Sequence, residues 1–216
     1  TFFKAADLYE RANGTRYREI EFALPNELGL KEHKEIIETF IERHLKDHYY
    51  AYAIHDKIGA MSNGEHNTHV HIMFSERELD DIERTAERSP KMFFRRANKQ
   101  NPEKGGCKKA AKWNGKDRAK YLCRMREDFA RIQNDVLEKY GEKTRVDHRS
   151  LKAQYMAALQ DQNFALARLL DRYPEVHVGP IAAAHPDNPK VVDILAYRQY
   201  KLERSELVYA ANVIEA

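Results

Sequence analysis

The stretch "AIHDKIGAMSNGEHNTHVHIMFSER", from Ala53 to Arg77, decides the fold because it contains the end of one strand, a loop and a second strand. In its segment "THVHIMFSE", apolar side chains alternate with His69 and His71, which is the period of a strand with one buried face. Residues two apart on a strand project from the same face. Both histidines are therefore expected on one face of a sheet, and the apolar residues between them on the other.

Two other segments repeat this alternation, "YREIEFALP" (residues 17–25) and "YYAYAIHD" (residues 49–56). When the three expected strands are sorted by face, one face collects large apolar side chains suited to a core. The opposite face collects small alanines and the polar residues His55, His69, His71, Glu19 and Glu21. Packing does not explain so many imidazoles beside alanines, so the sorting indicates a functional face.

Helices are expected on the apolar face of this sheet. Residues 31–47 place apolar side chains on one helical stripe, and residues 116–140 form a longer amphipathic helix that ends at Gly141. Residues 161–172 and about 190–210 are further helical stretches. We therefore expect an α+β fold, with helices on one face of an antiparallel sheet and a helical C-terminal half. Its expected parts are a sheet core (1–90), a basic segment (91–115) and a helical part (116–216).

The composition excludes several classes of protein. No apolar run approaches the roughly 18 residues that would cross a bilayer, so no membrane segment is expected. Two cysteines, Cys107 and Cys123, are too few for a disulfide scaffold or a cysteine-rich zinc site. These features indicate a reduced, cytoplasmic protein.

The charge is unevenly distributed along the chain. The net charge is only +3, but residues 91–120 contain eleven Lys and Arg against Glu103 and Asp117. This window therefore carries +9 and the rest of the chain −6. A local basic field on an otherwise acidic protein is what a polyanion site requires, although a solvated charged loop would show the same composition.

The histidine face predicts a metal site. His69 and His71 can reach one ion, and His55 from a neighbouring strand completes a set of three. Three neutral imidazoles that leave coordination positions open are typical of a catalytic metal site. Glu19 or Glu21 would orient a histidine or act as a base, and both are candidates for this catalytic role. His66 is expected in an exposed loop, and three histidines are expected to be solvated on the polar side of the helix at 31–47: His33, His44 and His48.

The basic window predicts a nucleic-acid contact surface. Cations there would grip backbone phosphates, and aromatic rings would stack on unpaired bases. Trp113 is the expected stacking residue, while Phe93 and Phe94 either stack or fill the core. The expected phosphate contacts are Arg95, Arg96, Lys99, Lys108, Lys109 and Lys112.

Several motifs, in order, resemble those of the MobA/MobL plasmid-mobilisation relaxases of the HUH endonuclease class: "RYREIEFALPNEL", "AIHD…HNTHVHIMFSER", "FFRRANKQNPEKGGCKKA", "RVDHRSLKAQ" and "PEVHVGP". The resemblance implies a relaxase domain with an HUH-type sheet, which nicks the transfer origin by transesterification and stays linked to the 5′ phosphate. By motif position it implies that His55, His69 and His71 hold a divalent ion, Mn²⁺ or Mg²⁺. It implies single-stranded transfer-origin DNA and accessory mobilisation proteins as partners.

The nucleophile implied by the resemblance is a tyrosine upstream of "FFKAADLYERANG", whereas this sequence begins within that region at Thr1. We therefore expect residues 1–216 to bind metal and DNA but to nick poorly. Three other functions are compatible with parts of the sequence. They are a rolling-circle replication initiator of the HUH class, a non-catalytic DNA-binding module whose histidines merely pack, and a zinc hydrolase of small molecules, which the basic window disfavours.

Overall fold

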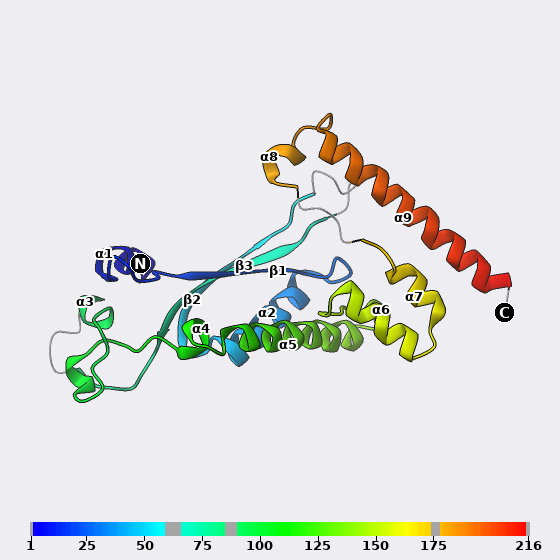
Figure 1. Cartoon of the computed structure of the whole chain (residues 1–216). Coiled ribbons are helices and arrows are strands. Elements are labelled where there is room, and N and C mark those ends of the chain that lie inside the picture. The colour runs from blue at the N-terminus through cyan, green and yellow to red at the C-terminus, as the bar shows by residue number, and fades with distance from the viewer. Residues whose placement is uncertain (1, 59–65, 85–89, 174–177, 215–216) are drawn as a thin grey trace. The chain divides into compact units, whose positions relative to one another are not determined.

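The structure is a computed structural model that describes residues 2–58, 66–84, 90–173 and 178–214. The chain divides into two compact units (Figure 1). Unit 1 comprises residues 1–57 and 67–146, and it contains all the strands of the described residues. Unit 2 comprises residues 58–66 and 147–216 and is helical.

Unit 1 is built on a three-stranded antiparallel sheet in the order β1-β3-β2. The strands are β1 (Arg18–Ala23), β2 (His48–His55) and β3 (His69–Glu78). In the register, Glu21 and Ala53 lie opposite His71, and Ala23 and His55 lie opposite His69. Directly paired residues share a face, so the register confirms the predicted division into an apolar and a histidine face.

Two helices cover the apolar face, α2 (Leu30–His44) and α5 (Arg118–Lys139) (Figure 1). The ring of Phe22 in β1 stacks on Phe129 at 3.8 Å between centroids and meets Phe40 edge-on at 4.7 Å. Burying each such ring contributes about 1.5–3 kcal/mol. Helix α5 ends as predicted, because Gly141 takes the left-handed conformation with φ of 81°. The predicted α+β architecture, with helices on one face of an antiparallel sheet, is confirmed.

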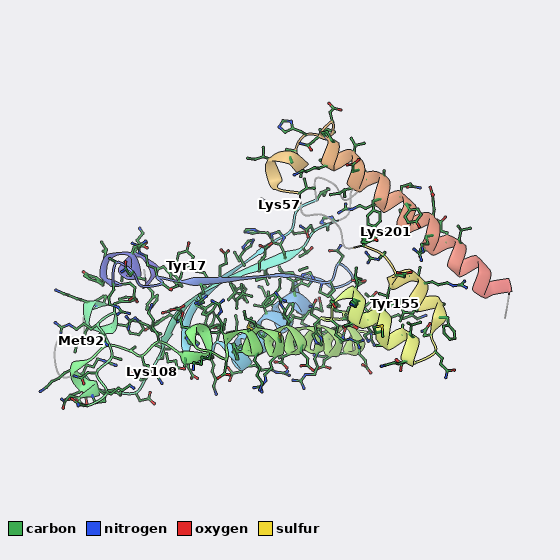
Figure 2. All side chains as sticks on the ribbon, in the orientation of Figure 1. Tyr17, Lys57, Met92, Lys108, Tyr155 and Lys201 are labelled. Atoms are coloured by element: carbon green, nitrogen blue, oxygen red, sulfur yellow. The ribbon has the colours of Figure 1, made fainter. Side chains whose placement is uncertain are left out.

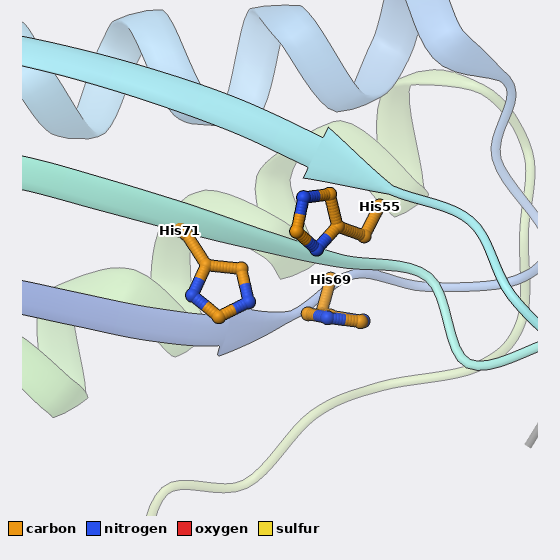
Figure 3. Close-up of side chains that lie close together, drawn as sticks. All are labelled: His55, His69 and His71. Carbon is orange, nitrogen blue, oxygen red and sulfur yellow. The ribbon is translucent and has the colours of Figure 1, made fainter.

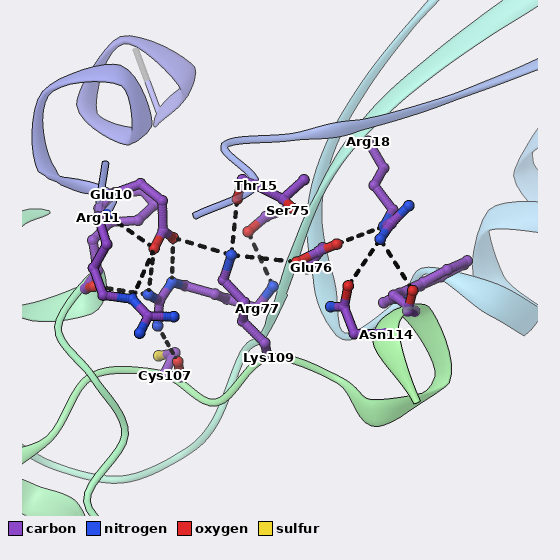
Figure 4. Close-up of polar contacts among 12 residues, drawn as sticks. Glu10, Arg11, Thr15, Arg18, Ser75, Glu76, Arg77, Cys107, Lys109 and Asn114 are labelled. Carbon is purple, nitrogen blue, oxygen red and sulfur yellow. Dashed lines mark hydrogen bonds and ion pairs between the residues drawn. The ribbon is translucent and has the colours of Figure 1, made fainter. Parts of the chain in front are cut away.

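Short elements close the end of unit 1 where β3 finishes: α1 (Phe2–Tyr9), α3 (Pro90–Phe93), the 3-10 helix η1 (Pro102–Lys104) and α4 (Ala111–Asn114). A buried ion pair holds α1 there, because the guanidinium of Arg77 donates to both carboxylate oxygens of Glu10 at 2.9 and 3.0 Å (Figure 4). The same guanidinium donates to three main-chain carbonyls, those of Phe94, Arg95 and Cys107. One side chain therefore fixes α1 and two parts of the basic segment against β3.

A neighbouring carboxylate, that of Glu76, extends this network toward β1. It accepts a hydrogen bond from Arg18 at 2.6 Å and lies 3.3 Å from the ammonium of Lys109 (Figure 4). Burial by itself raises the pKa of Glu10, but the contacts with Arg77 bring this pKa below its usual value. Both carboxyl groups are 1% exposed, so each needs its cationic partner.

Unit 2 consists of α6 (Leu151–Gln160), α7 (Phe164–Leu170), α8 (Pro180–Ala183) and α9 (Pro189–Ile214). The helix predicted at 161–172 begins later, because Gln162 takes a positive φ of 57° and the side chain of Asn163 caps α7 by accepting from the Leu166 amide. None of the helices in the described residues is both long and apolar enough to cross a membrane.

The prediction that three histidines are solvated on the helix at 31–47 is wrong. His33 is buried and hydrogen-bonds to the carbonyl of Pro25 at 2.8 Å. His44 lies between the Tyr121 hydroxyl (3.1 Å) and the Asp128 carboxylate (2.9 Å). His48 belongs to β2, where burial is the main cause that lowers its pKa. Each of the three has a hydrogen-bond partner outside the helix at 31–47, which a local helical pattern does not reveal.

Candidate metal centre and nucleic-acid interface

Three histidines meet on the open face of the sheet (Figure 3). His69 and His71 project from the central strand β3, and His55 projects from β2 directly opposite His69. The ring centroids lie 5.3 Å apart for His55 and His69, 4.8 Å for His55 and His71, and 5.1 Å for His69 and His71. The strand alternation thus delivers all three rings to one point, as the sequence predicted.

The nitrogen geometry of this His55–His69–His71 triad suits one ion. One ligand atom from each ring lies within 4.8 Å of the other two. Ligands bonded to one ion at about 2.1 Å lie roughly 3–4 Å apart. Small ring rotations therefore bring the three nitrogens to bonding distance, and the neighbouring alanines at positions 23 and 53 are exposed and do not obstruct them.

Hydrogen bonds orient two of the three rings. The Nδ1–H of His69 donates to the carbonyl of Asn67 at 2.7 Å, and the Nδ1–H of His71 donates to the Glu19 carboxylate at 2.6 Å. Each bond uses Nδ1 as the donor, so the lone pair is on Nε2 in both rings. Rings held in this way are prepared to ligate a metal through Nε2.

The two candidate carboxylates differ in what they contact. Glu21 is the register partner of His71, yet the carboxylate that reaches the ring of His71 is that of Glu19, opposite Met73. The strand pattern places both on the site face without separating them. The geometry assigns the orienting contact to Glu19 and leaves a catalytic role of either residue as a proposal.

Replacing Glu19 by Gln is expected to weaken divalent-metal affinity by about 10- to 100-fold, because His71 loses its charged orienting partner. Isothermal titration of Mn²⁺ into both proteins measures the change. Glu21→Gln is the matched control, since it removes an equivalent charge on the same strand and face. An equal loss of affinity in both variants would attribute the effect to general electrostatics and contradict the orienting role.

A family model described as MobA/MobL matches residues 1–185. The chain belongs to the MobA/MobL family. Among its relatives, a "43 kDa relaxation protein" of Salmonella typhimurium is 43% identical over 155 residues, covering 71% of this chain and 40% of the relative. A "Mobilization protein A" of Escherichia coli is 39% identical over 182 residues, covering 83% of this chain and 22% of the relative. The matched region therefore spans less than half of each relative.

One solved structure similar to this MobA/MobL chain is described as "Molecular Basis of Vancomycin Resistance Transfer in Staphylococcus aureus". It is 28% identical, with a TM-score of 0.47, and the match covers 68% of this chain and 64% of that chain.

The basic segment of this MobA/MobL chain lies at the opposite end of β3 from the triad. Lys108 and Lys109 run beside the last residues of the strand, where the Glu78 amide donates to the Lys108 carbonyl at 2.9 Å. Figure 2 shows Lys108 and Met92 at this end of unit 1. Arg77 lies six positions after His71, which is roughly 20 Å of strand. Four cations predicted to bind DNA are exposed here: Arg95, Arg96, Lys99 and Lys108.

The other predicted DNA contacts of the MobA/MobL chain have partners within the protein, and only Lys112 keeps donors to spare. Trp113 is only 2% exposed and its indole N–H points to His48 Nε2 at 3.4 Å, so stacking on a base is contradicted. Lys109 is held by the Thr15 carbonyl and the carboxylates of the buried network. The Lys112 ammonium donates to the His44 carbonyl at 2.9 Å. These side chains are engaged by partners distant in sequence, which the Gly- and Lys-rich composition of their segment conceals.

Proposed function

We propose that this chain is the relaxase domain of a plasmid or integrative-element mobilisation protein, which acts on single-stranded DNA at a transfer origin. The observation that carries the proposal is the triad of His55, His69 and His71 on the open face of the sheet, within a MobA/MobL chain. The names of the two relatives, a relaxation protein and a mobilisation protein, support it.

Three imidazoles are a suitable donor set for a divalent cation, and Mn²⁺ or Mg²⁺ is proposed on the basis of the family. His55, His69 and His71 would hold the cation, and the imidazoles are neutral ligands that leave its positive charge undiminished. Such a cation supplies Lewis-acid polarisation of a phosphodiester oxygen. Glu19 holds the ring of His71 in place, and the exposed alanines around the triad leave room for a DNA phosphate to approach.

The separation of the two sites suggests how the strand of DNA is held. The exposed cations of the basic segment lie roughly 20 Å along the sheet from the triad. The basic segment would therefore bind backbone phosphates several nucleotides from the scissile bond. Accessory mobilisation proteins are further proposed partners, on the strength of the family alone.

The nucleophile is proposed to be a tyrosine other than Tyr9, Tyr17, Tyr49 and Tyr50. Tyr17 and Tyr49 lie at the ends of strands remote from the triad, and Tyr50 lies opposite Phe74, three residues beyond His71 along β3. None of these four residues is therefore proposed to form the covalent adduct with an origin oligonucleotide. Detection of an adduct on a denaturing gel, mapped to one of the four, would contradict this assignment.

Fluorescence anisotropy of a labelled single-stranded oligonucleotide, titrated at several salt concentrations, tests the nucleic-acid proposal. Replacing Arg96 and Lys108 by Gln is expected to weaken binding and to reduce the slope of log K against log salt by about 1.4, at about 0.7 for each phosphate that is no longer neutralised. The control removes two charges from α2 that are also exposed, Lys31→Gln with Lys34→Gln. An affinity that does not depend on salt concentration, or that falls equally in both double variants, would contradict the proposed DNA surface.

A further inference from the structure

A cavity of about 440 Å³ lies between α4 and the first two turns of α5. It belongs to the helices of unit 1 and shares no residue with the triad. Three of its lining residues are cationic and one is acidic: the full lining is Ala111, Lys112, Gly115, Asp117, Lys120, Tyr121 and Arg124. The excess of positive charge raises the question of what compensates it.

Lys112 is a half-buried cation that forms no ion pair in the part of the chain that the structure describes. Its ammonium group donates to the His44 carbonyl and lies over the rings of Trp113 at 5.3 Å and Tyr121 at 5.5 Å. Burial lowers the pKa of Lys112, because desolvation disfavours the charged form. An ammonium group has three donors, so Lys112 retains hydrogen-bonding capacity toward an anion.

Lys120 and Arg124 are exposed and lie four residues apart on α5, so they share one helical face. Neither forms an ion pair within the described residues. Farther along the same helix Arg131 pairs with Asp128 and Lys139 pairs with Glu35, whereas Arg126, which does not line the cavity, forms no ion pair within the described residues. At the cavity itself, α5 leaves two like charges unpaired.

We infer that this cavity binds a phosphate group, with Lys112, Lys120 and Arg124 as its cationic contacts. The Tyr121 hydroxyl is not among them, because it is already hydrogen-bonded to His44 at 3.1 Å. Asp117 opposes an anion, so the net lining charge is +2. The source we assign is a phosphodiester of nucleic acid, and this assignment alone rests on the proposed function.

The chain carries its own reporter of this cavity, because Trp113 is its sole tryptophan and lies under the Lys112 ammonium. Inorganic pyrophosphate, titrated without DNA or metal, is expected to give a saturable change in tryptophan emission. Lys120→Gln with Arg124→Gln is expected to weaken this binding at least about tenfold, since charge-assisted hydrogen bonds are removed. Arg126→Gln is the control, because Arg126 is exposed on the same helix and does not line the cavity.

A second titration with a single-stranded oligonucleotide identifies the source of the phosphate. The double variant is expected to reduce the salt slope of DNA binding by about 1.4, at about 0.7 for each phosphate contact. A pyrophosphate response that depends on Lys120 and Arg124, together with unchanged DNA binding, would overturn the nucleic-acid source. An absent response, or one equal in the double variant and the control, would overturn the site itself, whatever the outcome at the triad.

Discussion

Replacing His69 and His71 together by alanine is expected to abolish Mn²⁺ binding. These two residues of the central strand supply two of the three imidazoles in the triad. Without them, His55 would be the single protein ligand of the ion. Isothermal calorimetry should show a saturable heat for the native chain and none for the double variant. Both side chains project from the open face, so the thermal midpoint without metal should change little.

The control for this experiment is His66→Ala, which removes an exposed imidazole three residues before His69 and outside the triad. Its calorimetric heat should equal that of the native chain. Equal heats for the native chain and the double variant would contradict the metal site. They would favour the alternative in which the histidines merely pack in a DNA-binding module.

Replacing Arg77 by Met is expected to lower the free energy of unfolding by about 3–5 kcal/mol, because the buried Glu10 carboxylate loses its two hydrogen bonds from Arg77 and keeps only the longer contact with Lys109 at 3.7 Å. The side chains of Arg77 and Glu10 are 3% and 1% exposed, so water cannot compensate. The three carbonyls that Arg77 holds are also left without their donor. Urea unfolding followed by circular dichroism measures the decrease in stability.

Two controls separate the buried pair from a general effect of removing an arginine. Arg77→Met combined with Glu10→Gln should be less destabilising than Arg77→Met alone, since no orphaned charge remains. Arg84→Met breaks the more accessible pair with Asp80 and should remove only about 0–1 kcal/mol through that pair. A destabilisation by Arg77→Met no larger than that by Arg84→Met would refute the role of the buried network.

The sequence is sufficient to predict the faces of the sheet and the members of the triad, because both follow from a local rule. Alternation along a strand has a period of two, so the faces of β1, β2 and β3 can be sorted without knowing their order. This sorting puts His55, His69 and His71 together and directs Phe22 and Ile72 into the core. The folded structure then separates Glu19 from Glu21, which no local pattern could do.

The basic segment is harder to predict because long-range interactions decide its structure. Lys109 meets Glu10 and Glu76, and Lys112 meets the carbonyl of His44. Trp113 lies in a segment rich in glycine and lysine, yet it packs on Phe74 and His48 in the core. Composition indicates that such a segment is charged, but only the fold shows which charges face solvent.

Core residues and candidate metal ligands alternate along the central strand β3. Val70 and Ile72 are buried on one face, and His69 and His71 lie on the other. Inserting or deleting a single residue within this strand would exchange its two faces beyond that point. The metal ligands would then be driven into the core and the core residues out to solvent. The same alternation along β3 thus sets both the core and the metal site. An insertion or deletion that shifts this alternation would eliminate the stability of the sheet and the metal site together.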